Sequence, residues 1–402
     1  MISKSWQAAA VLGVLALGLT ACGKDAAPSA GDSLTGEPLK VVQLVAFPND
    51  PSTGKAGVDA AVEAINKAGG VGGRPIEIEY CEGPDVNKTQ QCARDAVADK
   101  SVLAAVNNLD AFGGFSPIAS EGGLPGVGIL PINDADFVCK NCFFVTPGSL
   151  SAAGSAGLLH DVLGSKHIAG AYIDVPSAQG RNRLVKEGVL APRGLDFAAS
   201  VPVPPTATDV GPIIAALPGD VDGLYISSTR DQTAKIILQA RKSGAKYPIA
   251  VPALTISAAA LNELVGKQGT DIYVASPFNT DSDGYESYQK EMDAIGKAGS
   301  PEDHAIALNG WVAVHLFADA VEKAGADNVT RESLTAALKA TSDYDTGGLT
   351  PPLDWTKPQT AMGGSLSAVT NLSLMAYKFN ADTGKLDPVG DQTFLDIFGA
   401  GS

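Results

Sequence analysis

The sequence is poor in positive charge and in long apolar runs. Lysine and arginine number 29 against 44 aspartate and glutamate residues, so the formal net charge is −15. An acidic chain repels nucleic-acid phosphates and anionic lipid headgroups, which excludes both as partners of the folded body. After the first 21 residues no apolar run approaches the roughly 20 residues that a membrane-spanning helix needs. No later segment is therefore expected to transport anything by itself.

Motifs of the common enzyme classes are also missing. The sequence has no G-x-S-x-G, no G-x-x-x-x-G-K-[ST], and no G-x-G-x-x-G directly after a predicted strand. The histidines show no ligand-like grouping, and we interpret them as core or surface residues: His160, His167, His304 and His315. The sequence thus indicates neither an enzyme nor a resident metal or cofactor.

The first 21 residues have the composition of a secretory signal peptide. Lys4 precedes an uncharged run over 8–19, which is too short to span a bilayer, and small residues follow it. Leu-Thr-Ala-Cys at 19–22 resembles the lipobox of bacterial lipoproteins, which implies that Cys22 carries diacylglycerol and becomes the first mature residue. A cysteine placed there by chance is the alternative. We expect an exported protein, lipid-anchored to the extracytoplasmic face of the cell membrane through a flexible tether over 22–38.

The chain has five cysteines, and setting Cys22 aside leaves an even number. In an exported protein this predicts two disulfides. Cys81 with Cys92 and Cys139 with Cys142 is the favoured connectivity of three, because the partners in each pair are close in sequence. A zinc site or a redox-active C-x-x-C is the alternative, since Cys139 and Cys142 also have the spacing of metal ligands.

From residue 39 onward short apolar runs alternate with amphipathic stretches, which is typical of parallel sheets covered by helices. A buried strand over 41–47, for example, precedes apolar residues at helical spacing over 58–65. We expect further strands over 76–80, 102–106, 126–130, 168–173, 197–203, 223–227, 249–253, 272–275 and 374–380, and further helices over 89–99, 151–163, 178–189, 210–217, 233–243, 258–265, 284–297, 303–323 and 331–340. Two sheets in succession fit this pattern better than one sheet of about ten strands.

Several segments resemble one family. The segment over 64–77 joins a helix end, a Gly-rich turn and a strand; Cys81 and the segments over 92–94 and 237–244 follow. With 347–354 added, they resemble the branched-chain amino-acid type of ABC-transporter solute-binding protein, which has the type I periplasmic-binding-protein fold. The likeness covers nearly the whole mature chain.

The resemblance implies an α/β protein with two Rossmann-like lobes, whose parallel sheets are joined by three hinge crossings around a ligand cleft. Lobe I is then expected over 39–148 and 278–352, and lobe II over 149–277 and 353–402. The implied partners are a small-molecule solute and an ABC permease in the membrane, and the protein itself is expected to be a monomer. The implied mechanism is closure of the lobes around the solute.

Ligands of open α/β sheets bind beyond the carboxyl ends of the strands. We therefore take loop residues that follow predicted strands as ligand-binding candidates, with a solvated turn as the alternative for each. The candidates are Phe47, Asn49, Asn108, Asp110, Phe112 and Asn133 in the first lobe, Asp174, Gln179, Thr229, Arg230, Leu254 and Thr255 in the second, and Phe278 at a crossing strand.

The chain departs from the implied family pattern in these loops. Relatives that carry amino acids have a Ser/Thr cluster where this chain has 108–112, an aromatic residue where it has Gln179, and a carboxylate where it has 253–255. An α-amino acid would lose both charge partners, and an unpaired buried charge costs about 3–5 kcal/mol. We predict an apolar or aromatic ligand that is uncharged or mono-acidic, its acid pairing with Arg230 unless Arg230 only forms a surface ion pair with Asp231. Branched-chain amino-acid binding, a ligand sensor with a membrane signalling partner, and a hydrolase are the alternatives.

Overall fold

The computed structural model describes residues 34, 36–45, 54–390 and 393–398. In its first sheet the inner strands are apolar on both faces, and every residue of Val102–Val106 is buried, whereas most residues of the edge strand Ile76–Glu82 are exposed or half-buried. Burial on both faces is typical of a parallel sheet covered by helices. The strands are β1 (Leu39–Val45), β2 (Ile76–Glu82), β3 (Val102–Val106), β4 (Gly126–Val127) and β5 (Cys142–Phe143), all parallel in the order β2-β1-β3-β4-β5.

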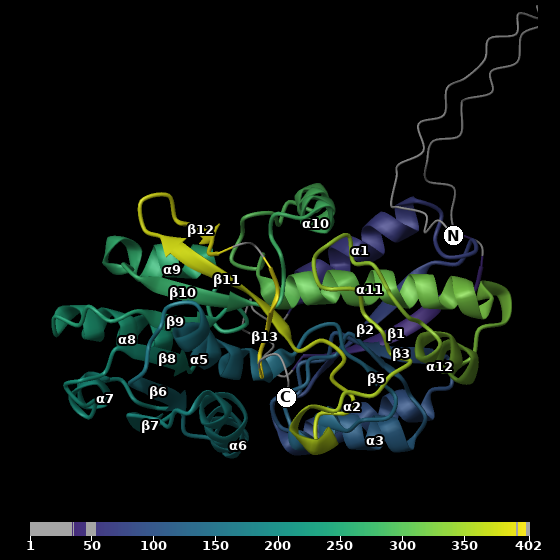
Figure 1. The fold of residues 1–402 in the computed structure, drawn as a ribbon. Coiled ribbons are helices and arrows are strands. Elements are labelled where there is room, and N and C mark those ends of the chain that lie inside the picture. Colours follow the sequence, from purple (N-terminus) through teal and green to yellow (C-terminus); the bar gives the residue numbers. More distant parts are fainter. Residues whose placement is uncertain (1–33, 35, 46–53, 391–392, 399–402) are drawn as a thin grey trace, which may run out of the picture.

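The second sheet repeats this order in its parallel part, β7-β6-β8-β9-β10, and the end of the chain extends it. β11 is antiparallel to β10 and also pairs with β12 and β13. The strands are β6 (Ile168–Ile173), β7 (Ala199–Val203), β8 (Gly223–Ser227), β9 (Ile249–Pro252), β10 (Ile272–Ser276), β11 (Ser373–Asn380), β12 (Lys385–Pro388) and β13 (Leu395–Asp396). Figure 1 shows the two sheets in two lobes that lie side by side.

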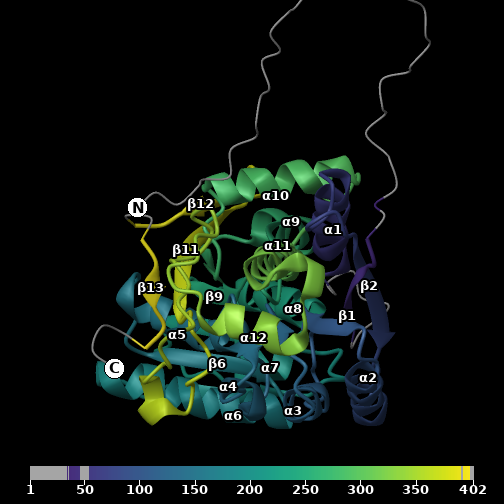
Figure 2. The same cartoon turned by 90° about the vertical axis from the view of Figure 1, so that its right-hand side faces the viewer.

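Helices of the first lobe come from two separated parts of the chain. They are α1 (Lys55–Lys67), α2 (Val86–Ala98), α3 (Phe115–Glu121) and α4 (Asp134–Phe137), then α10 (Asp283–Ala294), α11 (Ala305–Ala324) and α12 (Arg331–Lys339). The mostly buried α11 contacts α1 and α12, while α10 lies across the top of the lobe in Figure 2. Gly57 in α1 permits this packing, since a Cβ there would overlap the backbone of Ala307.

The second lobe has its helices between β5 and β10. They are α5 (Ser151–Asp161), α6 (Pro176–Leu184), α7 (Gly211–Ala215), α8 (Arg230–Lys242) and α9 (Ala258–Leu264). The central α5 contacts β8, β9 and β10. It contains many small residues, and nine of its eleven are buried. Both lobes are therefore sheets covered by helices, as the alternating sequence pattern predicts.

The chain passes between the sheets three times: after β5, after β10, and between α12 and β11. Side chains bind these crossings to each other. The Asn371 amide donates to the Val145 carbonyl at 3.1 Å, and the Tyr377 hydroxyl accepts the Thr280 N–H at 2.8 Å. The predicted fold class, two Rossmann-like lobes with three crossings, is confirmed.

The four cysteines of the folded body form two disulfides. Cys81 at the end of β2 pairs with Cys92 in α2, and Cys139 pairs with Cys142, with Cα atoms 5.9 and 5.4 Å apart. The predicted local connectivity is confirmed, and the cysteines do not form the alternative zinc site. Cys22 lies outside the described residues.

Some predicted elements differ from those in the structure. The strand predicted over 126–130 ends at Val127, because Gly128 has a φ of +57° and turns the chain out of the sheet. The helix predicted over 178–189 ends at Leu184 and continues as a π-helix, Val185–Leu190. The very short β5 and α4, and the seven-residue α3, were not predicted.

Candidate functional site

The strand orders determine where a ligand cleft lies. In each sheet the direction of winding reverses between two neighbours, β1 and β3 in the first sheet and β6 and β8 in the second. Ligands of open parallel sheets bind beyond the carboxyl ends of the strands at such points. Most of the candidate residues follow these strands, whereas Phe47 and Asn49 lie outside the described residues.

The loop after β3 is folded around the carboxylate of Asp110. Its oxygens accept the backbone N–H groups of Phe112, Gly113 and Phe115 at 3.1, 2.9 and 2.7 Å. Burial raises the pKa of Asp110 above its ordinary value, although these N–H groups oppose the shift. Asn133 donates to the Asp110 carbonyl at 2.8 Å. The side chains of Asp110 and Asn133 therefore fix the conformation of the loop through hydrogen bonds to its backbone.

Asn108 has an unused donor. Its Oδ1 accepts the Leu44 N–H at 2.8 Å, while its Nδ2 is buried and has no hydrogen-bond partner among the described residues. A buried donor without a partner costs free energy, which a ligand acceptor would recover. Of the candidates that follow β3, Asn108 is the one with an unmet polar atom.

A buried amide network holds the backbone next to Asn108. Asn107 has a φ of +47°, in the left-handed region. Asn309 in α11 donates to Asn107 Oδ1 at 2.8 Å and to the Gly128 carbonyl at 2.6 Å, and Thr146 in the first crossing donates to Asn309 Oδ1 at 3.2 Å. The network thus links the loop after β3 to a crossing between the lobes.

In the second lobe, Asp174 and Gln179 bind each other. The Gln179 amide donates to Asp174 Oδ1 at 2.9 Å, and both side chains are exposed. Thr229 caps α8 by accepting the Gln232 N–H at 3.4 Å. None of the three lines either cavity described below. The side chains of these three candidates are used in local hydrogen bonds and not in the walls of the cavities.

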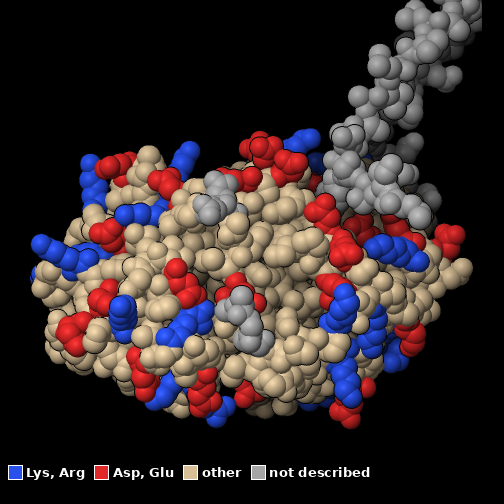
Figure 3. All heavy atoms as spheres, viewed as in Figure 1, with Lys and Arg blue, Asp and Glu red and all other residues tan. Residues whose placement is uncertain are grey.

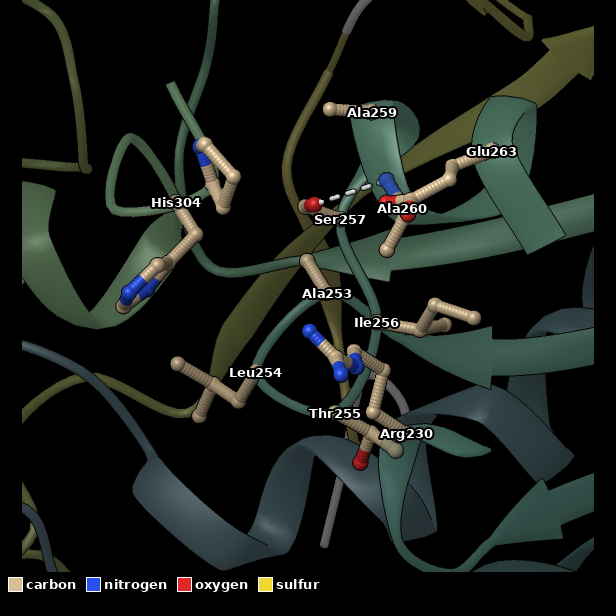
Figure 4. A pocket seen from close by; sticks show the side chains of 11 residues that line it. Arg230, Ala253, Leu254, Thr255, Ile256, Ser257, Ala259, Ala260, Glu263 and His304 are labelled. Atoms are coloured by element: carbon tan, nitrogen blue, oxygen red, sulfur yellow. Dashed lines mark hydrogen bonds between the residues drawn. The ribbon is translucent and has the colours of Figure 1, made fainter. Parts of the chain in front are cut away.

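Arg230, Leu254 and Thr255 line one small cavity of about 50 Å³. Figure 4 shows the Arg230 guanidinium extending toward Ala253 and Leu254, with His304 on the opposite side. Arg230 Nε also lies 3.0 Å from Asp231 Oδ1, so the predicted surface ion pair is present. Such an exposed pair contributes little, which leaves the guanidinium available to an anion.

A second cavity of about 200 Å³ adjoins the first. The two cavities share part of the loop after β9, the start of α9, and His304. The second contains Phe278 together with Tyr285 and Tyr288 of α10. Helix α10 packs on α1 of the first lobe, and α9 lies in the second lobe between β9 and β10. Both lobes therefore form the walls of this second cavity.

Several residues that line these cavities were not among the sequence candidates, and three of them illustrate the reason. His304 caps α11 through Nδ1, which accepts the Ile306 N–H at 3.2 Å, so it is neither a core nor a simple surface histidine. Tyr285 and Glu263 lie inside helices rather than after strands. The one available signal was the position of His304 directly before a long apolar run, where a capping residue is expected.

The sequence matches the family model described as periplasmic binding protein over residues 49–370. The chain belongs to this family. Its members are binding proteins rather than enzymes and work outside the cytoplasm. No curated protein sequence matches the chain.

Solved structures share the fold at low sequence identity. A substrate-binding periplasmic protein from Ralstonia solanacearum is 18% identical with a TM-score of 0.72, over 86% of this chain and 98% of that one. LivJ from Streptococcus pneumoniae, solved with isoleucine, is 18% identical with a TM-score of 0.69, over 89% and 99%. A solute-binding protein from R. palustris, solved with benzoate, is 17% identical with a TM-score of 0.72, over 88% and 96%. The type I fold predicted from the sequence is confirmed.

Within the described ranges, no helix is both long and apolar enough to cross a membrane. The same residues contain no group of three or more His, Cys, Asp or Glu side chains that could hold a metal ion. On the face drawn in Figure 3, acidic and basic side chains are interspersed around a largely uncharged middle.

Proposed function

We infer that this protein is the ligand receptor of an ABC importer, and that it captures one small organic molecule between its lobes and presents it to a membrane permease. The observation that supports this most directly is the pair of adjoining cavities with walls from both lobes. Ligand contacts from both sides stabilise the closed arrangement of such a protein. We propose that the lobes meet near residues 149, 278 and 353.

We propose a mono-acidic or uncharged ligand with an apolar or aromatic body, and not a standard α-amino acid. Arg230 lines the smaller cavity and is available for one acid group, whereas the buried Asn108 lines neither cavity. Glu263 is the one carboxylate that lines the Arg230 cavity, and it is exposed at the rim. A solvated carboxylate pairs weakly with an ammonium group. A relative solved with isoleucine is 18% identical to this chain, and one solved with benzoate is 17% identical. Because these identities are so similar, the choice of ligand class rests on the residues of this chain.

Calorimetric titration tests the ligand class. We expect no heat of binding with leucine, isoleucine or valine, and binding with benzoate or 3-phenylpropionate. Micromolar binding of any of the three amino acids would contradict the proposal in favour of branched-chain amino-acid transport. Solution scattering in the same samples should show a smaller radius of gyration when the ligand is bound.

We further propose that Cys22 is lipidated and anchors the protein through the tether over 22–38. The apolar run over 8–19 and the Leu-Thr-Ala-Cys motif support this. Mass spectrometry of the membrane fraction should find a diacylglyceryl group on Cys22, and Cys22→Ser should release the protein. A Cys22→Ser variant that stays membrane-bound would contradict the anchor without affecting the ligand proposal.

A further inference from the structure

The larger cavity beside the Arg230 cavity has the size and lining of a ring-binding pocket. Its volume is about 200 Å³. An apolar cavity of about 150 Å³ is known to accept benzene. Its walls include Phe278, Tyr285, Tyr288 and Leu308, and the Tyr285 and Tyr288 rings lie 5.9 Å apart at an interplanar angle of 40°. We name this cavity the aromatic pocket.

Two polar side chains of the aromatic pocket, Asp303 and Ser276, are already bound within the protein. Asp303 accepts hydrogen bonds from Tyr288 at 2.8 Å, from the Gln289 amide at 3.0 Å and from the Gly299 N–H at 2.8 Å. Ser276 accepts the Phe278 N–H at 3.1 Å. A fully bonded carboxylate does not require a ligand cation, so the pocket favours an uncharged group.

Tyr285 differs from Asp303 and Ser276. Its hydroxyl makes no hydrogen bond within the described part of the chain, and burial raises the pKa of Tyr285 to about 12. The hydroxyl is therefore protonated at neutral pH, where it can donate one hydrogen bond. It offers a partner to an acceptor atom on a bound ring.

We propose that the aromatic pocket binds the ring of a monocarboxylate whose acid group pairs with Arg230 in the adjoining cavity. The two cavities share Ile256, Ser257 and His304, so one molecule can occupy both. The ligand class is then an aryl or alicyclic acid rather than a linear acid. This inference deepens the proposed function and rests on it.

Two alanine-to-phenylalanine variants test the pocket. Ala258, the first residue of α9, is half-buried and lines the aromatic pocket but not the Arg230 cavity. Ala258→Phe should fill the pocket and weaken 3-phenylpropionate binding at least tenfold, whereas Ala216→Phe, at an exposed residue that lines neither cavity, should leave the affinity unchanged. Equal affinity of wild type and a folded Ala258→Phe variant would overturn the proposal.

Benzene and xenon test the pocket without any acid group. We expect benzene to raise the Tm of the wild type but not of Ala258→Phe, and xenon to bind between Phe278 and Tyr285 in pressurised crystals. An empty pocket in both experiments would overturn the proposal even if Ala258→Phe failed to fold. If benzene binds but no solute closes the lobes, the receptor function fails while the pocket stands.

Discussion

Arg230 and Glu263 line the same small cavity with opposite charges, which makes them a matched pair for mutation. If the ligand is a monocarboxylate, Arg230→Gln removes a charged hydrogen-bond partner and should weaken 3-phenylpropionate binding about tenfold or more. Glu263→Gln should leave the affinity unchanged or slightly improve it. Calorimetry of both variants distinguishes an acid ligand from a zwitterion, since a zwitterion would lose affinity in both.

Asn309 is a buried side chain that three polar groups depend on. Asn309→Leu would leave Asn107 Oδ1, the Gly128 carbonyl and the Thr146 hydroxyl without this partner. Unsatisfied buried groups cost about 1–3 kcal/mol each, so the loss of three hydrogen bonds should lower the free energy of unfolding by about 3 kcal/mol or more. Urea unfolding measures the loss, with the exposed Asn328→Leu as the control. A loss below that of the control would show that the network does not stabilise the protein.

Asp110 should make the free energy of unfolding depend on pH, and the direction of its raised pKa gives the sign of this dependence. Its folded pKa lies above the ordinary value, so the folded state holds this proton more tightly than the unfolded state. Its contribution to stability is then greatest below the ordinary aspartate pKa and declines as the pH rises through the raised value. Urea unfolding at several pH values should show this decline in the wild type, and Asp110→Asn should remove it. An unchanged slope in the variant would assign the decline to other groups.

The two disulfides close loops of different length and should contribute differently. The partners are 11 residues apart in Cys81–Cys92 and 3 apart in Cys139–Cys142. A longer closed loop restricts the unfolded chain more, by about 1 kcal/mol for this difference. The Cys81→Ser/Cys92→Ser variant should therefore be less stable than Cys139→Ser/Cys142→Ser in thermal unfolding. The reverse order would indicate that the short disulfide acts mainly on the folded state.

Strands that are apolar on both faces could be predicted accurately from the sequence. The ranges of β3, β6 and β8 match the predictions residue for residue, because a fully buried strand is a continuous apolar run with polar residues or glycine at its ends. The two-residue β5 is too short to show any period, and it forms only through pairing with β4. Tertiary contacts, not local pattern, determine such elements.

The candidate site was predictable only where it follows strands. Arg230 and Leu254 come directly after or shortly after buried strands, and both line the small cavity. Tyr285 reaches the larger cavity from a helix that packs on the first lobe after the second crossing. No local sequence pattern predicts that Tyr285 lies at this cavity, because its position depends on how the crossings bring the lobes together. For the same reason the internal hydrogen bonds of Asp174 and Gln179 were not foreseen.

Ligand binding between two lobes should stabilise the protein as one unit. A ligand at a hundred times its Kd adds about 2.7 kcal/mol to the free energy of unfolding if it binds only the folded state. We expect 3-phenylpropionate to raise the Tm in proportion to the logarithm of its concentration, and hexanoate to raise it less. Equal shifts from both acids would show that the ring makes no contribution.

The final strands of the chain, β11 to β13, belong to the second sheet, although α10 to α12 before them return to the first. Neither lobe is therefore a continuous stretch of polypeptide, and pairing across long separations makes folding slow. During synthesis and export, the second sheet stays unfinished until its C-terminal edge has emerged. The order of segments along the chain thus delays completion of the second sheet until the last strands are available to pair.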